Sequence, residues 1–126
     1  MAGPLGTAPL RTAPSRPLSE AILLTTFPEI GTMEEHQAFR RVADGARLVR
    51  YGMDCYGYAL LAAGQVDLVI EAGLQPYDVQ APIAVVTAAG GIATDWDGRP
   101  AHEGGRLLAA ANREVHEVAL QLLAGL

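Results

Sequence analysis

Several features that assign proteins to specialised classes are scarce in this chain. Its single cysteine, Cys55, cannot form an internal disulfide, so nothing indicates an oxidising compartment. The best candidate for a membrane-spanning helix is interrupted by Gln65, Asp67 and Glu71, and no apolar run approaches the roughly 18 residues required. The amino terminus has no basic segment followed by an apolar run, as a secretory signal would. We therefore expect a cytoplasmic protein.

Charged residues are also sparse, at 18% of the chain, and acidic residues outnumber basic ones. Nine basic and fourteen acidic residues give a net charge of −5, spread along the sequence. Nucleic acids and anionic membranes are bound by basic surfaces, so this composition argues against both as partners. Half of the 126 residues are apolar, which predicts one globular domain rather than a disordered chain.

Residues 1–17 are rich in proline and glycine and predict an extended arm without regular structure. We expect residues 18–126 to form the folded domain. There, apolar strand-like runs alternate with helical patterns, which predicts an α/β fold, a layered mixed sheet with helices packed on its faces. The expected strands lie at about 18–26, 47–51, 66–71, 92–94 and 107–111.

Four helices are expected between these strands. Thr32 and Asn112 are suitable N-caps for the first and the last, which should span about 33–46 and 113–123. The second should span 53–63 and the third 78–89, with Pro82 in or just after its first turn. The third helix is apolar on almost every side, so we expect it to be buried.

The segment that ends in Asp78 is the strongest candidate site. An apolar strand leads to Glu71, a Pro76–Tyr77 turn follows, and Asp78 begins the apolar helix. Because Asp is a common N-cap, spacing alone favours a structural role for Asp78. The functional alternative is an oxygen ligand for Mg²⁺, which is held by one or two protein carboxylates together with substrate phosphate.

Three segments agree in order and spacing with one enzyme family. They are YGMDCYGYALLAAGQVDLVIE at 51–71, PYDVQA at 76–81 and AAGGIATDWDG at 88–98. Together they resemble the inositol monophosphatase family, most closely its histidinol-phosphate phosphatases, with a similarity that runs from about Leu18 to the last residue. The resemblance implies the fold of the C-terminal part of that family.

The resemblance also implies roles for three carboxylates. Asp78 corresponds to the family's last metal-binding aspartate, and Glu71 to the acidic residue that contacts the organic part of the substrate. Asp54 matches the histidinol-phosphatase pattern, in which a carboxylate attracts a cationic amino alcohol more than a neutral polyol. Read from its position alone, Asp54 is a helix N-terminal acid. Met53 replaces a common glycine, which indicates a narrower pocket.

The implied cofactor is Mg²⁺, and the implied substrate is a phosphomonoester such as histidinol phosphate, an intermediate of histidine biosynthesis. The family's other metal ligands, a helical glutamate pair and an Asp-Pro-x-Asp-Gly-Thr loop, have no counterpart here, since the sequence contains no Asp-Pro. We therefore expect a truncated C-terminal half with no catalytic residue of its own and weak or absent Mg²⁺ binding, inactive without a separate N-terminal half. Two alternatives stay open: a non-catalytic binding or assembly module, possibly homo-oligomeric, and a degenerate remnant.

The remaining reactive side chains do not suggest a second site. His36, His102 and His116 lie in three different predicted elements without the spacing of metal ligands, and each is expected to be on the surface or hydrogen-bonded. Cys55 is expected to pack as a small hydrophobic residue.

Overall fold

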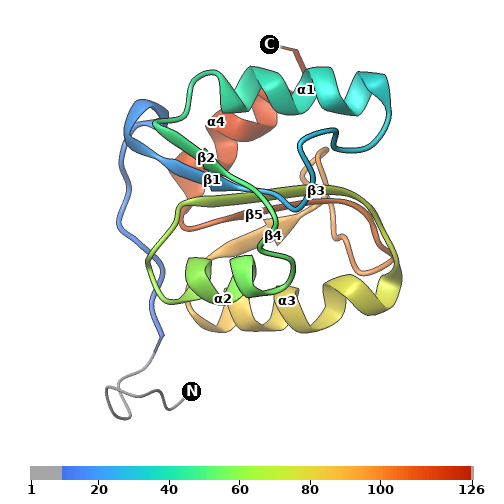
Figure 1. Cartoon of the computed structure of the whole chain (residues 1–126). Coiled ribbons are helices and arrows are strands. Elements are labelled where there is room, and N and C mark those ends of the chain that lie inside the picture. The colour runs from blue at the N-terminus through green and yellow to red at the C-terminus, as the bar shows by residue number, and fades with distance from the viewer. Residues whose placement is uncertain (1–9, 126) are drawn as a thin grey trace.

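The computed structural model describes residues 10–125, which form a five-stranded sheet between two layers of helices (Figure 1). Helices α1 (Met33–Ala43) and α4 (Arg113–Leu123) pack together on one face of the sheet. Helices α2 (Tyr56–Ala62) and α3 (Pro76–Ala88) pack together on the other. The predicted layered α/β fold is confirmed. None of the helices in this part of the chain combines the length and apolar character needed to cross a membrane.

The sheet is mixed, with the strand order β2-β1-β3-β5-β4. Strands β2 (Leu48–Arg50), β1 (Ile22–Leu24) and β3 (Leu68–Leu74) are parallel. Strand β5 (Gly105–Ala110) is antiparallel to both β3 and β4 (Ile92–Thr94). The carboxyl ends of the three parallel strands therefore meet at one edge of the sheet, which is where α/β proteins usually bind ligands.

An apolar core lies on each side of the sheet. Successive residues of a strand point to opposite faces, so Leu108 joins the cluster under α1 and α4 while Leu107 joins the cluster under α2 and α3. Phe39 and Val42 supply the helical side of the first cluster, from the buried side of α1. This double burial explains why residues 107–110 of β5 form a continuous apolar run.

Several element boundaries differ from the predicted ones. The first predicted strand is shorter, because Leu18–Glu20 forms a 3₁₀ turn before β1. Helix α3 begins at Pro76 rather than at residue 78, since proline is favoured at the first helical position. Pro82 therefore lies inside the helix, where it is buried, and not in the first turn. Only the side of α3 that faces the sheet reaches the core, so the prediction that the whole helix is buried is wrong.

The described part of the proline-rich arm, residues 10–17, contains no helix or strand and is anchored to the domain. Arg16 Nε lies 2.8 Å from Oδ1 of the almost completely buried Asp67, whose Oδ2 accepts a 2.8 Å hydrogen bond from the Ile22 backbone N–H. The backbone N–H of Thr12 donates to the Ala89 carbonyl at 3.1 Å. Residues 1–9 lie outside the described residues.

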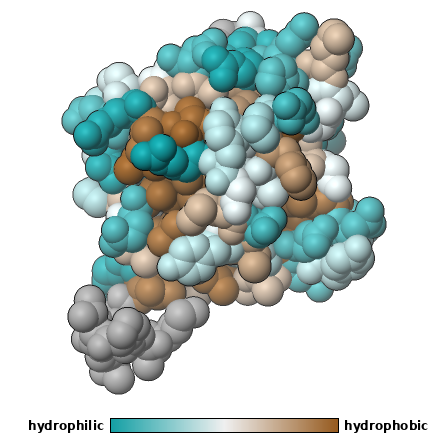
Figure 2. All heavy atoms as spheres, viewed as in Figure 1, coloured by the Kyte–Doolittle hydropathy of each residue, from teal (hydrophilic) through white to brown (hydrophobic). Residues whose placement is uncertain are grey.

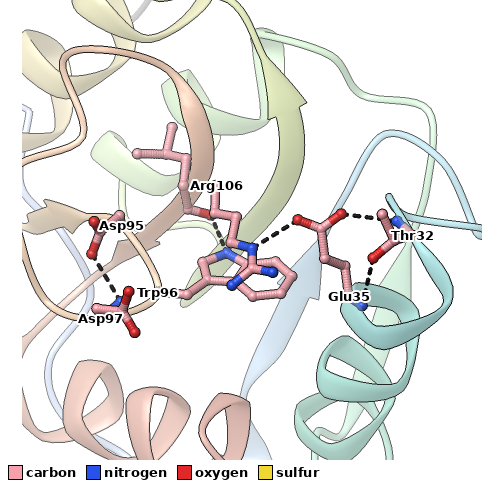
Figure 3. A network of polar contacts seen from close by, with 7 residues as sticks. Thr32, Glu35, Asp95, Trp96, Asp97 and Arg106 are labelled. Carbon is pink, nitrogen blue, oxygen red and sulfur yellow. Dashed lines mark hydrogen bonds and ion pairs between the residues drawn. The ribbon is translucent and has the colours of Figure 1, made fainter.

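A polar network joins the start of α1 to β5 (Figure 3). Thr32 caps α1 as predicted and forms a reciprocal capping box with Glu35. Glu35 Oε2 accepts a 2.7 Å bond from Arg106 Nε, and the Arg106 guanidinium lies 5.1 Å from the centre of the Trp96 ring. Burial raises the pKa of Glu35, but hydrogen bonds from Thr32 and Arg106 outweigh it and lower that pKa overall. The network fixes one end of the α1 layer to the sheet.

A buried histidine supports the edge strand β4. His116 of α4 has its Nε2 atom 2.8 Å from the hydroxyl oxygen of Thr94. The single hydroxyl proton of Thr94 is donated to the Asp95 carbonyl at 2.7 Å, so Nε2 must carry the proton that bonds Thr94. Burial lowers the pKa of His116; Glu117 opposes this shift and Arg113 adds to it.

We expect this histidine to make the fold less stable in mild acid. A depressed pKa in the folded state means that the unfolded chain binds the proton more readily, so stability is retained above about pH 6.5 and falls as the pH drops toward the folded-state pKa. Urea unfolding between pH 7.5 and 5.5 should therefore show a smaller loss for His116→Gln than for the wild type. The exposed His102→Gln is the matched control and should lose as much stability as the wild type. If His116→Gln also lost as much free energy of unfolding as the wild type over this pH range, His116 would not be the group responsible.

Candidate active site

A cavity of about 320 Å³ lies at the edge where the parallel strands end. Two of its polar residues belong to neighbouring parts of the sheet. Thr26 lies just after the end of β1, and Glu71 lies in β3. The β1–β3 register pairs Leu24 with Val69, so it brings Thr26 opposite Glu71. The cavity is lined by Thr26, Phe27, Asp54, Cys55, Tyr58, Glu71, Leu74 and Asp78. All three carboxylates predicted from the sequence thus border one cavity.

Glu71 is the buried acid of this cavity, with 8% of its surface exposed. Its Oε2 accepts a 2.7 Å hydrogen bond from the Thr26 hydroxyl, and its Oε1 accepts a 2.5 Å bond from the Tyr58 hydroxyl. Burial raises the pKa of Tyr58 well above its usual range, and the charge of Glu71, the hydrogen bond to it and the charge of Asp78 raise it further. Tyr58 therefore stays protonated and holds the carboxylate in one orientation.

Asp78 lies in the first turn of α3, at the mouth of the cavity. The sequence alone favoured Asp78 as the N-cap of this helix, but it is the third helical residue. Gln75 is the N-cap, and its backbone N–H donates to Asp78 Oδ2 at 2.9 Å. One carboxylate oxygen is thereby oriented by the first turn of the helix.

Asp54 lies in the turn between β2 and α2 and is exposed. Its φ of +49° is the only left-handed value among the described non-glycine residues, a conformation that Asp tolerates better than most. The turn is tied to the sheet because the Gly52 N–H donates to the carbonyls of Thr25 and Thr26, at 3.1 and 2.8 Å. The chain thus holds this carboxylate at the cavity in a costly backbone conformation.

Sequence reasoning missed two polar residues of the cavity, Thr26 and Tyr58, in their role as partners of Glu71. The role of Thr26 follows from the register of β1 against β3, which no short stretch of the sequence encodes. One other prediction was wrong. Cys55 is exposed at the cavity rather than packed as a small hydrophobe, because the turn before α2 turns it outward. His36 is partly exposed, as expected for a surface residue, although its Nδ1 atom is buried with no hydrogen-bond partner among the described residues.

The sequence matches the profile of the inositol monophosphatase family over residues 3–125. This chain belongs to the inositol monophosphatase family. The resemblance of the three segments is therefore confirmed. A related protein, the bifunctional phosphatase IMPL2 of Arabidopsis thaliana, called chloroplastic, is 43% identical over 115 residues, which cover 84% of this chain and 33% of that protein.

Other members of the family agree with this assignment. A histidinol-phosphatase of Chlorobaculum parvum is 39% identical over 67 residues, covering 53% of this chain and 26% of that enzyme. An inositol monophosphatase of Zymomonas mobilis superposes with a TM-score of 0.87 at 36% identity, covering 91% of this chain and 46% of that one. The chain thus spans less than half of each of these relatives.

The described residues do not fit a complete metal site. No group of three His, Cys, Asp or Glu side chains between residues 10 and 125 is placed to hold one ion. Asp78 has the donor chemistry of a Mg²⁺ ligand, whereas Glu71 already accepts two protein hydrogen bonds and Asp54 comes from a different turn. Any ion bound at Asp78 would need further ligands from elsewhere.

Proposed function

We propose that this chain forms one wall of a Mg²⁺-dependent phosphomonoesterase site and acts with a further unit that supplies the other metal ligands. The observation that carries the proposal is the arrangement of Asp54, Glu71 and Asp78 around one cavity, each from a different segment. A bound Mg²⁺ would polarise the phosphate ester and activate water. Asp78 would provide one oxygen ligand for this ion. The cytoplasmic location of the protein stays a prediction.

The charge of the cavity supports a substrate with a cationic organic part. It is bordered by three acidic residues, and none of the described lining residues is basic. Such a cavity would repel a bare phosphate and attract an ammonium or imidazolium group. We propose that Asp54, exposed at the cavity, attracts this group while Glu71, held by Thr26 and Tyr58, contacts the organic part of the molecule. Histidinol phosphate has this chemistry.

The test is reconstitution of activity. The purified chain should hydrolyse histidinol phosphate with Mg²⁺ no faster than buffer. Co-expression with the part of the Zymomonas mobilis enzyme outside the matched segment should produce Mg²⁺-dependent turnover. In that complex, Asp54→Asn should raise the KM for histidinol phosphate about tenfold and leave that for neutral inositol phosphate nearly unchanged. Mg²⁺-dependent turnover by the chain alone would contradict the need for a further unit.

A further inference from the structure

An exposed aromatic ring borders the acidic cavity. Phe27 lines this cavity together with Thr26, Tyr58 and Glu71, and 69% of its surface is exposed. Figure 2 shows hydrophilic residues over α1 at the top, whereas apolar and hydrophilic residues are mixed on the right, where the parallel strands end. Single apolar residues scattered over a surface need no explanation, but a phenyl ring that borders a cavity offers contact area to a ligand.

The backbone around Phe27 is held in place on both sides. The preceding residue, Thr26, donates its hydroxyl proton to Glu71 at 2.7 Å, and its carbonyl accepts the Gly52 N–H at 2.8 Å. Pro28 follows, and a residue before proline is restricted to extended backbone conformations. The phenyl ring is therefore carried by a segment that is tied both to the buried carboxylate and to the turn before α2.

The charge and the shape of the cavity together favour a flat cation. The lining acids Asp54, Glu71 and Asp78 attract positive charge, and no described lining residue is basic. The negative face of a phenyl ring attracts a cation that lies within about 6 Å of its centre. A planar cation such as imidazolium also stacks on the ring, whereas an alkylammonium group has no flat face to do so. An aromatic wall beside carboxylates thus selects for both charge and planarity.

We propose that Phe27 is a specificity-determining residue, whose ring stacks on a planar cationic ring in the organic part of the substrate. This role rests on the proposed function and adds a selection that the carboxylates cannot make, because they attract flat and flexible cations alike. Tyr58 cannot serve as the stacking surface. It is only 3% exposed, and its hydroxyl is already bonded to Glu71.

The test compares the binding of two organic dications to the purified chain. Histidinol carries an imidazole, which is mostly protonated at pH 6 because its ordinary pKa is about 6.5, and lysinol carries the same charge on a flexible chain. NMR titrations give both dissociation constants for the wild type, for Phe27→Leu, which keeps an apolar side chain, and for Phe27→Trp, which keeps an aromatic one. Tyr56→Leu is the matched control, since Tyr56 is 60% exposed at the start of α2 and does not line the cavity.

We expect the wild type to bind histidinol more tightly than lysinol. Phe27→Leu should weaken histidinol binding about fivefold and change lysinol binding less than twofold, because only the planar cation loses its stacking partner. Phe27→Trp and Tyr56→Leu should keep the preference for histidinol. No histidinol binding by the wild type, no preference between the two dications, or equal losses of both in Phe27→Leu would each overturn the proposal.

The reconstituted complex separates the role of Phe27 from the phosphatase activity. Turnover of histidinol phosphate that depends on Mg²⁺, with a KM that Phe27→Leu leaves unchanged, would refute the role of Phe27 and support the proposed function. A preference for histidinol that depends on Phe27, in a complex without phosphatase activity, would refute the proposed function and leave the stacking role of Phe27 standing.

Discussion

In the reconstituted complex, Asp78→Asn is expected to lower Mg²⁺-dependent kcat/KM for histidinol phosphate by about a hundredfold or more. Asparagine can still accept the hydrogen bond from the Gln75 N–H, so the start of α3 should persist. The variant removes a negative charge and one anionic ligand oxygen, which a hard cation prefers. Steady-state kinetics across a Mg²⁺ titration would show whether higher Mg²⁺ partly restores the rate.

Asp97→Asn is the matched control for this prediction. Asp97 is an exposed aspartate in the turn after β4, and its carboxylate makes no hydrogen bond within the described structure. The same loss of charge there should leave kcat/KM within about twofold of the wild type, because exposed charges far from a site are screened. Equal losses in both variants would mean that overall charge, and not a ligand at residue 78, governs activity.

Gly104→Ala is expected to destabilise the fold by about 2–5 kcal/mol. Gly104 has a φ of +85°, which an alanine rarely adopts, and a Cβ atom there would lie 2.5 Å from the carbonyl oxygen of Leu74 and 2.8 Å from the carbonyl carbon of Gln75. Both contacts are with backbone, so relief requires the chain itself to move. Urea unfolding monitored by circular dichroism measures the difference.

The neighbouring Gly105→Ala separates the two causes of this loss. Gly105 has almost the same φ, +84°, but a Cβ atom there would meet nothing within 4 Å. It should cost only the conformational strain, about 1–2 kcal/mol. Because the segment that Gly104 contacts leads directly into α3, Gly104→Ala should also displace Asp78 and reduce activity in the reconstituted complex. Equal stability of the two variants would show that the close contact is relieved at little cost.

The sequence alone determined much of the fold and the identity of the candidate acids. Helix starts at Thr32 and Asn112 depend on local chemistry, because a capping side chain bonds an N–H three residues away. The order of strands and helices follows from hydrophobic periodicity, which is likewise local. Motifs around Asp54, Glu71 and Asp78 pointed to the family before any geometry was known.

The tertiary structure decided how these residues meet. Thr26 and Tyr58 both contact Glu71, because β1 and β3 are parallel in a particular register and α2 packs over them. A register is set by packing of the whole sheet and leaves no trace in a short window of sequence. For the same reason, the sequence could describe α3 as apolar on every side, but only the packed structure revealed which side has no partner. Local patterns specify elements, while long-range contacts determine which surfaces and side chains those elements share.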